Sequence, residues 1–175
     1  MQLDGAVCRI TPWAAAHAND LAAIANDRTV VKYLSARIPH PYTRANAVEW
    51  IAMHRDAHAP SQFAVESDGE VVGSIGYAQG SGERAGTAMI GYFFKPAAWG
   101  RGLATDAVRV VTAHLFATPA IHRVWANVMA PNRASARVLE KNGYVHKATL
   151  HASILDRDGE RHDELIYART RVSSP

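Results

Sequence analysis

Hydrophobic residues recur with helical spacing in three stretches of the chain. The pattern predicts helices over residues 19–33 and 43–58, the second with Thr43 as its N-cap, and a third helix after the glycines at 100 and 102. Each of these helices should bury one face. The residues expected to face the core are Val48, Ile51 and Ala52 on the second helix and Leu103, Ala107, Val108, Val111 and Leu115 on the third.

Apolar runs bounded by polar and turn residues predict strands between and after these helices. The expected strands are 7–11, 62–66, 70–77, 87–94, 121–128 and 163–171. Asp68-Gly69 and Asp158-Gly159 are turn signals, so each marks a hairpin. The chain has 175 residues, of which 48% are hydrophobic and 20% charged. We therefore expect one mixed α/β (α+β) domain over residues 1–175.

The stretch from Phe93 to Thr105, FFKPAAWGRGLAT, joins a strand to a helix through glycines. Gly100 and Gly102 lack a Cβ, so their backbone can approach a ligand closely. The amides of a helix's first turn favour an anion, and Arg101 adds donors that suit phosphate oxygens. The loop predicts a pyrophosphate site, although a plain strand-to-helix turn has the same Gly-x-Gly pattern. Its spacing fits neither a nucleotide triphosphatase nor a dinucleotide-binding loop.

A second motif, APNRASARVLEKNGY, spans Ala130 to Tyr144. Asn132 is a natural N-cap and Gly143 a natural C-terminal stop, so the motif predicts a short helix. Asn132 and Ser135 lie three residues apart and share a face near the helix start. The structural alternative is that Asn132 only caps the helix and that Ser135 is a surface residue without a role in function. Ala134, Val138 and Leu139 can face the core. Arg133, Arg137 and Lys141 form a basic stripe, either a solvated face or a contact for a second phosphate.

With both motifs in this order, separated by the segment 121–128, the chain resembles the GNAT superfamily of N-acetyltransferases. Within it, the chain is most similar to the RimJ/RimL-type branch of ribosomal-protein N-terminal acetyltransferases. The resemblance runs from the strand at 7–11 to the closing DELIYARTR. It implies the GNAT acyl-CoA N-acyltransferase fold, a central, mostly antiparallel twisted sheet with a splayed parallel pair (87–94 and 121–128) and helices on both faces. Trp99 stands where the superfamily commonly has Gln or Arg, and this branch commonly has Trp there.

The same resemblance implies that the cofactor is acetyl-CoA. Backbone groups near Phe93 and Phe94 would pair with the pantetheine amides like an added strand. Asn132 would bond the pantetheine arm, and Ser135 would donate a proton to the departing thiolate. The cofactor-binding residues expected in this way are Phe93, Phe94, Lys95, Trp99, Gly100, Arg101, Gly102, Leu103, Ala104, Thr105, Asn132, Ser135, Arg137 and Lys141.

The implied reaction is direct attack of a neutral amine on the thioester in a ternary complex. With a reference pKa of ~7.8 against ~10.4, an α-amine is neutral far more often than a lysine and needs less help from a base. The leading acceptor is therefore a protein or peptide N-terminal α-amine. The alternatives are a small-molecule amine, such as an amino acid, polyamine or aminoglycoside, and a non-catalytic acyl-CoA-binding or sensing module.

Candidate catalytic residues besides Ser135 lie on the last strand. The strand 87–94 has no carboxylate where many GNAT enzymes place a catalytic glutamate, so Asp163 and Glu164 are the candidate bases. The structural alternative is that both are solvent-facing acids that balance nearby arginines. The acceptor-binding residues expected by resemblance are His40, Tyr42 and Tyr92. A turn built on two prolines explains the first two equally well.

Charge and composition limit the classes of ligand and partner that we expect this protein to bind. A net charge of +3 suits a polyanionic cofactor but falls short of a nucleic-acid surface. Cys8, the only cysteine, lies in an apolar run, so we expect no disulfide and a reducing cytoplasm. No apolar run approaches the roughly 20 residues of a membrane span, so we expect no membrane partner. His54 and His58 have ligand spacing but no third ligand, so no metal is predicted. An edge-strand homodimer is compatible with such a sheet.

Overall fold

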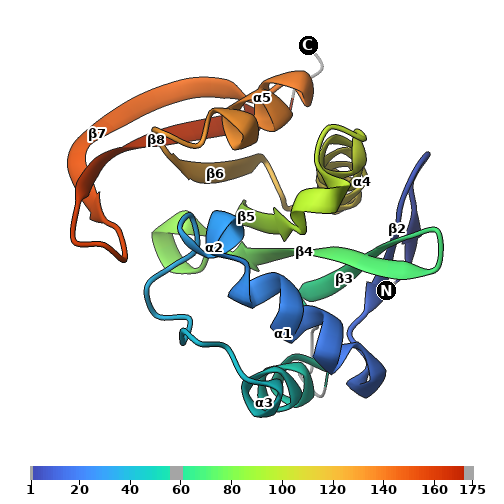
Figure 1. Ribbon diagram of the computed structural model, residues 1–175. Helices are drawn as coiled ribbons and strands as arrows, with labels where there is room; N and C mark the ends of the chain where they lie inside the picture. The colour runs from blue at the N-terminus through green and yellow to red at the C-terminus, as the bar shows by residue number, and fades with distance from the viewer. Residues whose placement is uncertain (1, 56–60, 172–175) are drawn as a thin grey trace. The chain divides into compact units, whose positions relative to one another are not determined.

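The computed structural model describes residues 2–55 and 61–171 (Figure 1). Its strands are β1 (Leu3–Asp4), β2 (Arg9–Pro12), β3 (Gln62–Ser67), β4 (Glu70–Gln79), β5 (Thr87–Phe94), β6 (Arg123–Met129), β7 (Val145–Leu155) and β8 (Arg161–Thr170). Its α-helices are α1 (Ala18–Asn26), α2 (Arg28–Val31), α3 (Arg44–Arg55), α4 (Leu103–Ala117) and α5 (Arg133–Lys141). Short 3-10 turns are η1 (Ala15–His17), η2 (Gly82–Arg84) and η3 (Pro96–Ala98).

The strands form one mixed sheet in the order β1-β2-β3-β4-β5-β6-β8-β7. Antiparallel ladders join β1 to β2, β2 to β3, β3 to β4, β6 to β8 and β7 to β8. β5 and β6 are parallel, with a ladder from Thr87–Arg123 to Met89–Trp125. Both strands continue beyond this short ladder. The mixed sheet with a parallel pair is confirmed, whereas the splay and the placement of helices on both faces stay predictions.

The elements group into two compact units, which are described separately. The first contains the chain up to Gly76 together with Tyr92–Ala107, and the second contains Tyr77–Gly91 and the chain from Val108. The prediction of one domain over residues 1–175 stays a prediction. Among the described residues, no helix combines the length and the apolar character that a bilayer span requires.

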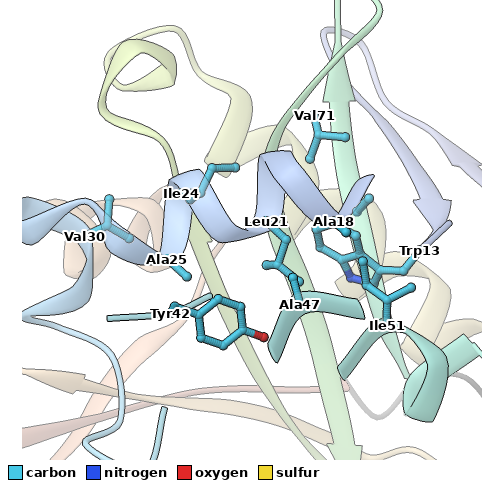
Figure 2. Close-up of a cluster of buried hydrophobic side chains, with 11 residues drawn as sticks. Trp13, Ala18, Leu21, Ile24, Ala25, Val30, Tyr42, Ala47, Ile51 and Val71 are labelled. Atoms are coloured by element: carbon cyan, nitrogen blue, oxygen red, sulfur yellow. The ribbon is translucent and has the colours of Figure 1, made fainter. Parts of the chain in front are cut away.

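The core of the first unit lies around α1 and α3 (Figure 2). The buried side chains of this cluster are Trp13, Ala18, Leu21, Ile24, Ala25, Val30, Tyr42, Ala47, Ile51, Ala64 and Val71. Trp13 meets Trp50 edge-on with ring centroids 5.8 Å apart, as expected of packing residues. Thr43 caps α3 as predicted, because its Oγ1 accepts from the Asn46 N–H at 3.2 Å.

The helix predicted over 19–33 is in fact two helices. Asp27 has an extended backbone (φ −65°, ψ 119°) that ends α1. Its carboxylate accepts from the Thr29 N–H at 2.8 Å and so caps α2. A residue that caps one helix cannot also continue the one before it, which explains the break.

Of the residues predicted to face inward on the next two helices, all are buried except Val48 and Ala52, of which Ala52 is half-buried. On α3, Ala47 and Ile51 are buried four residues apart, whereas Val48 is 40% exposed, so the prediction for Val48 is wrong. The predicted end of this helix at His58 lies outside the described residues. All five residues predicted to face inward on α4 are buried, namely Leu103, Ala107, Val108, Val111 and Leu115.

In the second unit, β7 and β8 form a long hairpin, drawn orange to red in Figure 1. The hairpin predicted at Asp158-Gly159 is thereby confirmed. Helix α5 ends at Lys141, just before the predicted stop at Gly143, whose φ is +75°. The Gly143 N–H donates to the Glu140 carbonyl at 2.9 Å and the Tyr144 N–H to the Leu139 carbonyl at 3.1 Å, the two bonds of a Schellman end.

Candidate functional site

The loop between η3 and α4 has the backbone of an anion cradle. Gly100 (φ +75°) and Gly102 (φ +80°) are both left-handed, and a Cβ built on either would meet nothing within 4 Å. The Gly102 carbonyl accepts from the Asp106 N–H at 2.9 Å, so Gly102 is the N-cap of α4. The first amides of a helix have no acceptor inside it, which leaves them to bind a ligand. The residues at this helix start are Gly100, Arg101, Gly102, Leu103, Ala104 and Thr105.

Trp99 fixes the strand side of the loop. Its Nε1–H donates to the Phe94 carbonyl at 2.9 Å, while the residue stays 52% exposed. Phe94 is buried, and the Tyr92 ring lies edge-on to it at 6.4 Å. Gly73 lets this end of β5 come close, because a Cβ there would lie 2.5 Å from the Phe93 carbonyl oxygen. One of the carbonyls that the resemblance assigns to pantetheine therefore already accepts a bond from the indole.

The two cations of the loop are paired with acids of the β3–β4 turn. Lys95 Nζ lies 2.8 Å from Glu70 Oε2, and Arg101 Nη2 lies 2.8 Å from Asp68 Oδ2. The hydrogen bond from Arg101 is the main cause of the lowered pKa of Asp68, and that from Lys95 of the lowered pKa of Glu70. Sequence reasoning missed both acids because they lie 33 and 25 residues from their partners.

Asp106 is another residue that the sequence patterns did not single out. It lies in the first turn of α4 and is 7% exposed. Its Oδ2 accepts from the Val7 N–H at 2.8 Å and lies 3.5 Å from the sulfur of Cys8, which is buried as expected. A Cβ on Gly5 would lie 2.2 Å from the same oxygen. The carboxylate thus ties the β1–β2 turn to the start of α4, and its place in a first helical turn is the signal that could have found it.

In the second unit, Asn132 and Ser135 stand at the start of α5. Asn132 Oδ1 accepts from the Ser135 N–H at 3.2 Å, which confirms Asn132 as the N-cap. Ser135 is half-buried. Ala136 and Leu139 are the buried residues of α5, and Ala134 is exposed, so the prediction that it faces the core is wrong. Ala136 shares a face with Leu139 because it lies three residues before it. The basic residues Arg133, Arg137 and Lys141 are all exposed.

Asp163, one of the two candidate bases, supports an irregular part of β7. It accepts from the Ala152 N–H at 2.9 Å and lies 3.1 Å from His151 Nδ1. These two bonds, that from Ala152 first, lower the pKa of Asp163. Ala152 has φ +49° where the β7–β8 register shifts. A carboxylate with a lowered pKa is a weaker base, which favours the structural alternative for Asp163.

Glu164, the other candidate base, is held by side chains. Its Oε1 accepts from Asn127 Nδ2 at 2.6 Å and its Oε2 from Ser153 Oγ at 3.1 Å. Asn127 lies on β6 and Ser153 on β7, so the carboxylate of Glu164 on β8 joins three neighbouring strands. Sequence reasoning missed both partners because an isolated polar residue on a strand has no motif. The carboxylate of Glu164 thus accepts from two side chains, whereas that of Asp163 accepts from a main-chain N–H.

Tyr42 lies in the core of the first unit (Figure 2). It is 6% exposed, and burial raises its pKa. Its main chain is held by Asn26, because the Tyr42 N–H donates to Asn26 Oδ1 at 2.7 Å and Asn26 Nδ2 donates to the Tyr42 carbonyl. His40 is exposed and Tyr92 half-buried. These positions favour a packing role for Tyr42, and acceptor binding by all three residues stays a prediction.

Three side chains in the β7–β8 turn come close enough to be considered as metal ligands. The ligand atoms of Asp156, Glu160 and His162 lie within 4.8 Å of one another. Asp156 Oδ2 lies 2.7 Å from His162 Nε2, while its Oδ1 accepts the N–H groups of Asp158 at 2.9 Å and Glu160 at 2.8 Å. The bond to His162 is the main cause of the lowered pKa of Asp156. Hydrogen bonds within the turn account for the cluster without a metal.

The histidine pair considered from sequence is only partly described. His54 Nδ1 lies 2.8 Å from the Trp50 carbonyl, and its ring stacks on Trp50 with centroids 4.0 Å apart. His58 lies outside the described residues. The contacts of His54 are those of a packed side chain.

An acetyltransferase (GNAT) domain model matches residues 8–145. The chain belongs to the GNAT acetyltransferase family. This GNAT chain is similar to the probable N-acetyltransferase YjcK of Bacillus subtilis, with 36% identity over 102 residues, 58% of this chain and 56% of YjcK. It is also similar to phosphinothricin N-acetyltransferase of Streptomyces coelicolor, with 31% identity over 117 residues, 62% of this chain and 66% of that protein. The matched part spans less than two thirds of either relative.

The fold of this GNAT chain is similar to that of Mycobacterium smegmatis RimJ, solved in complex with CoA-disulfide. The TM-score is 0.85 at 23% identity, over 100% of this chain and 88% of RimJ. This likeness confirms the expected GNAT fold and the RimJ/RimL-like architecture. At this identity it concerns the fold alone.

Proposed function

We propose that this GNAT protein is an acetyl-CoA-dependent N-acetyltransferase that moves the acetyl group to a primary amine by direct attack in a ternary complex. The observation that carries the proposal is the pair of left-handed glycines, Gly100 and Gly102, at the start of α4 within a GNAT domain. The open space over both glycines gives phosphates access to the first-turn amides. RimJ, which has the same fold, binds a CoA derivative, and this supports the same cofactor.

The acceptor in this proposal is a protein or peptide N-terminal α-amine. β5 reads TAMIGYFF and carries no carboxylate, so it offers no base. An α-amine is about a quarter neutral near pH 7.4, whereas a lysine side chain is about 0.1% neutral. The acceptor that needs least deprotonation fits best. The ammonium form of the acceptor must still lose a proton before it attacks. We assign Glu164, held by Asn127 and Ser153, as the carboxylate that accepts this proton.

The start of α5 supplies the groups for the leaving thiolate. We assign Ser135 as the proton donor to the CoA sulfur and Asn132 as a partner of the pantetheine arm. A thiol has a reference pKa of ~8.5, so its thiolate leaves readily and a hydroxyl donor suffices. Arg137 and Lys141, both exposed on α5, are assigned to the cofactor phosphates. Because Asn132 Oδ1 caps α5, Asn132 must bond the pantetheine arm through another of its atoms.

Two observations support alternative functions. The relative from Streptomyces coelicolor is named for a small-molecule acceptor, phosphinothricin, which supports a small-molecule amine as the second candidate. The missing carboxylate on β5 supports a non-catalytic acyl-CoA-binding module. A cytoplasmic location and an edge-strand homodimer stay predictions.

The test is release of CoA thiol from acetyl-CoA with a panel of N-terminal peptides, amino acids, polyamines and aminoglycosides, beside calorimetric titration of acetyl-CoA. We expect turnover with peptides that have a free α-amine and none with the same peptides blocked at the N-terminus. The Ser135→Ala variant should lose turnover and keep cofactor affinity, while Ser81→Ala, the same change at an exposed site, should lose neither. Cofactor binding without turnover on any amine would favour the binding module.

A further inference from the structure

The β3–β4 turn places two carboxylates against the two cations beside the glycine loop. Asp68 pairs with Arg101 and Glu70 with Lys95, each at 2.8 Å. We propose that Asp68 and Glu70 set the affinity for acetyl-CoA by competing with its phosphates for these two cations. This inference rests on the proposed function, because it takes acetyl-CoA as the ligand of the loop.

The two ion pairs are held in place by the backbone. Asp68 (φ +54°) and Gly69 (φ +79°) form the tight turn, with Ser67 opposite Glu70 at its base. The Lys95 N–H donates to the Val72 carbonyl at 2.9 Å and so joins the end of β5 to β4 just past the turn. Main-chain bonds therefore fix the two acids beside the cations.

The two ion pairs are also exposed enough to solvent for a phosphate to replace each carboxylate. The side chains of Asp68 and Glu70 are 79% and 73% exposed, those of Arg101 and Lys95 48% and 28%. Ion pairs in such settings are weak because water screens them. The phosphates of acetyl-CoA together carry more negative charge than the two carboxylates, and a phosphate can bind guanidinium through two parallel bonds as a carboxylate does. Incoming phosphates can therefore displace the acids.

Competition and repulsion act in the same direction. Each phosphate that takes Arg101 or Lys95 must first replace a carboxylate, and the carboxylates left behind repel the polyanion. Both effects weaken binding. The product CoA keeps the same phosphates as acetyl-CoA, so the acids should also speed its departure. Asp68 and Glu70 thus raise the dissociation rate of both ligands.

The test is calorimetric titration of acetyl-CoA into the Asp68→Asn/Glu70→Gln double variant, at about 20 mM and about 150 mM salt. The β7–β8 turn provides a control with the same sequence, Asp158-Gly159-Glu160. In the described part of the chain, neither acid of that turn forms a salt bridge to Lys or Arg, so Asp158→Asn/Glu160→Gln changes the net charge equally.

We expect the Asp68→Asn/Glu70→Gln variant to bind acetyl-CoA ~3–10-fold more tightly at low salt, with a smaller gain at high salt and slower CoA release in stopped flow. In an Arg101→Gln background, Asp68→Asn should increase the affinity less than in the wild-type background, because competition for the guanidinium is lost and only charge repulsion remains. Unchanged or weaker binding, or an equal gain in the control variant, overturns the inference while the proposed function stands. Failure of the wild-type protein to bind acetyl-CoA overturns both.

Discussion

Two hairpin turns of this protein carry the same tripeptide, Asp-Gly-Glu, but fold it differently. In the β3–β4 turn, the strands pair up to Ser67 and Glu70, and only Asp68 and Gly69 lie between them. Both residues have positive φ, as a two-residue turn of this kind requires. The short turn presents its two acids to the loop before α4.

The β7–β8 turn spreads the same tripeptide over a longer loop. Its last strand pair is Leu155 with Arg161, and of the tripeptide only Gly159 has positive φ, at +86°. The preceding Asp156 organises the loop by accepting N–H groups of the tripeptide and meeting His162. The difference shows that Asp156, two residues before the second tripeptide, and the elements nearby decide whether such acids pair with cations of another segment or stay within their own turn.

The largest expected effect is that of replacing Glu164, which lies on β8 in the longer hairpin. Glu164→Gln should lower kcat ~100-fold or more with little change in acetyl-CoA affinity, because a general base acts in the chemical step. Glutamine keeps one acceptor oxygen for Asn127, and its amide N–H can donate to the Ser153 hydroxyl, so the fold should survive. Steady-state kinetics with a peptide acceptor measures the effect. Asp163→Asn is the neighbouring control, and an equal fall in kcat there would remove the distinction between the two acids.

The next effect concerns the loop that the shorter hairpin faces. Gly102→Ala should weaken acetyl-CoA binding ~5–30-fold, because a left-handed residue with a Cβ is strained by ~1–2 kcal/mol and relief of that strain moves the cradle amides. Gly91→Ala is the control, since Gly91 has open space and no positive φ. Calorimetry gives both affinities. Equal values for the two variants would show that the cradle geometry does not matter for binding.

The smallest effect is the pH dependence of the longer turn. The pKa of Asp156 is lowered in the fold, chiefly by His162, so its ionised form stabilises the protein above the unfolded pKa of ~3.9 and this contribution is lost as the pH falls. Asp156→Asn should therefore lower the urea midpoint at pH 6 and change it less at pH 3. A difference of the same size at both pH values would contradict the assignment, and Asp68→Asn should shift the midpoint less than Asp156→Asn at pH 6.

Local signals predicted much of the fold. The strand 87–94 is found as β5 with the same bounds, and the Asp-Gly turns and the cap at Asn132 occur where expected. Each depends on neighbouring residues alone. The strand predicted over 163–171 begins at Arg161, and that predicted over 7–11 begins at Arg9, since strand ends depend on the partner's length.

The candidate site was less predictable where distant segments meet. The glycine loop could be found because its glycines and helix start are contiguous. The acid partners of Lys95 and Arg101 could not, since they come from another hairpin. The hydrogen bond from the Ala152 N–H to Asp163 depends on a bulge that has no sequence signal. The resemblance predicts that Tyr42 binds the acceptor, and its burial depends on the packing of α1 and α3, which no local sequence pattern shows.

The most direct test of the central claim, that the loop before α4 binds the phosphates of acetyl-CoA, is an amide NMR titration of the protein with acetyl-CoA. We predict that the amide signals of Gly100, Gly102 and Leu103 shift in proportion to bound cofactor, while that of Gly159 in the longer turn stays in place. Saturable shifts elsewhere with unchanged signals for the loop glycines would contradict the account.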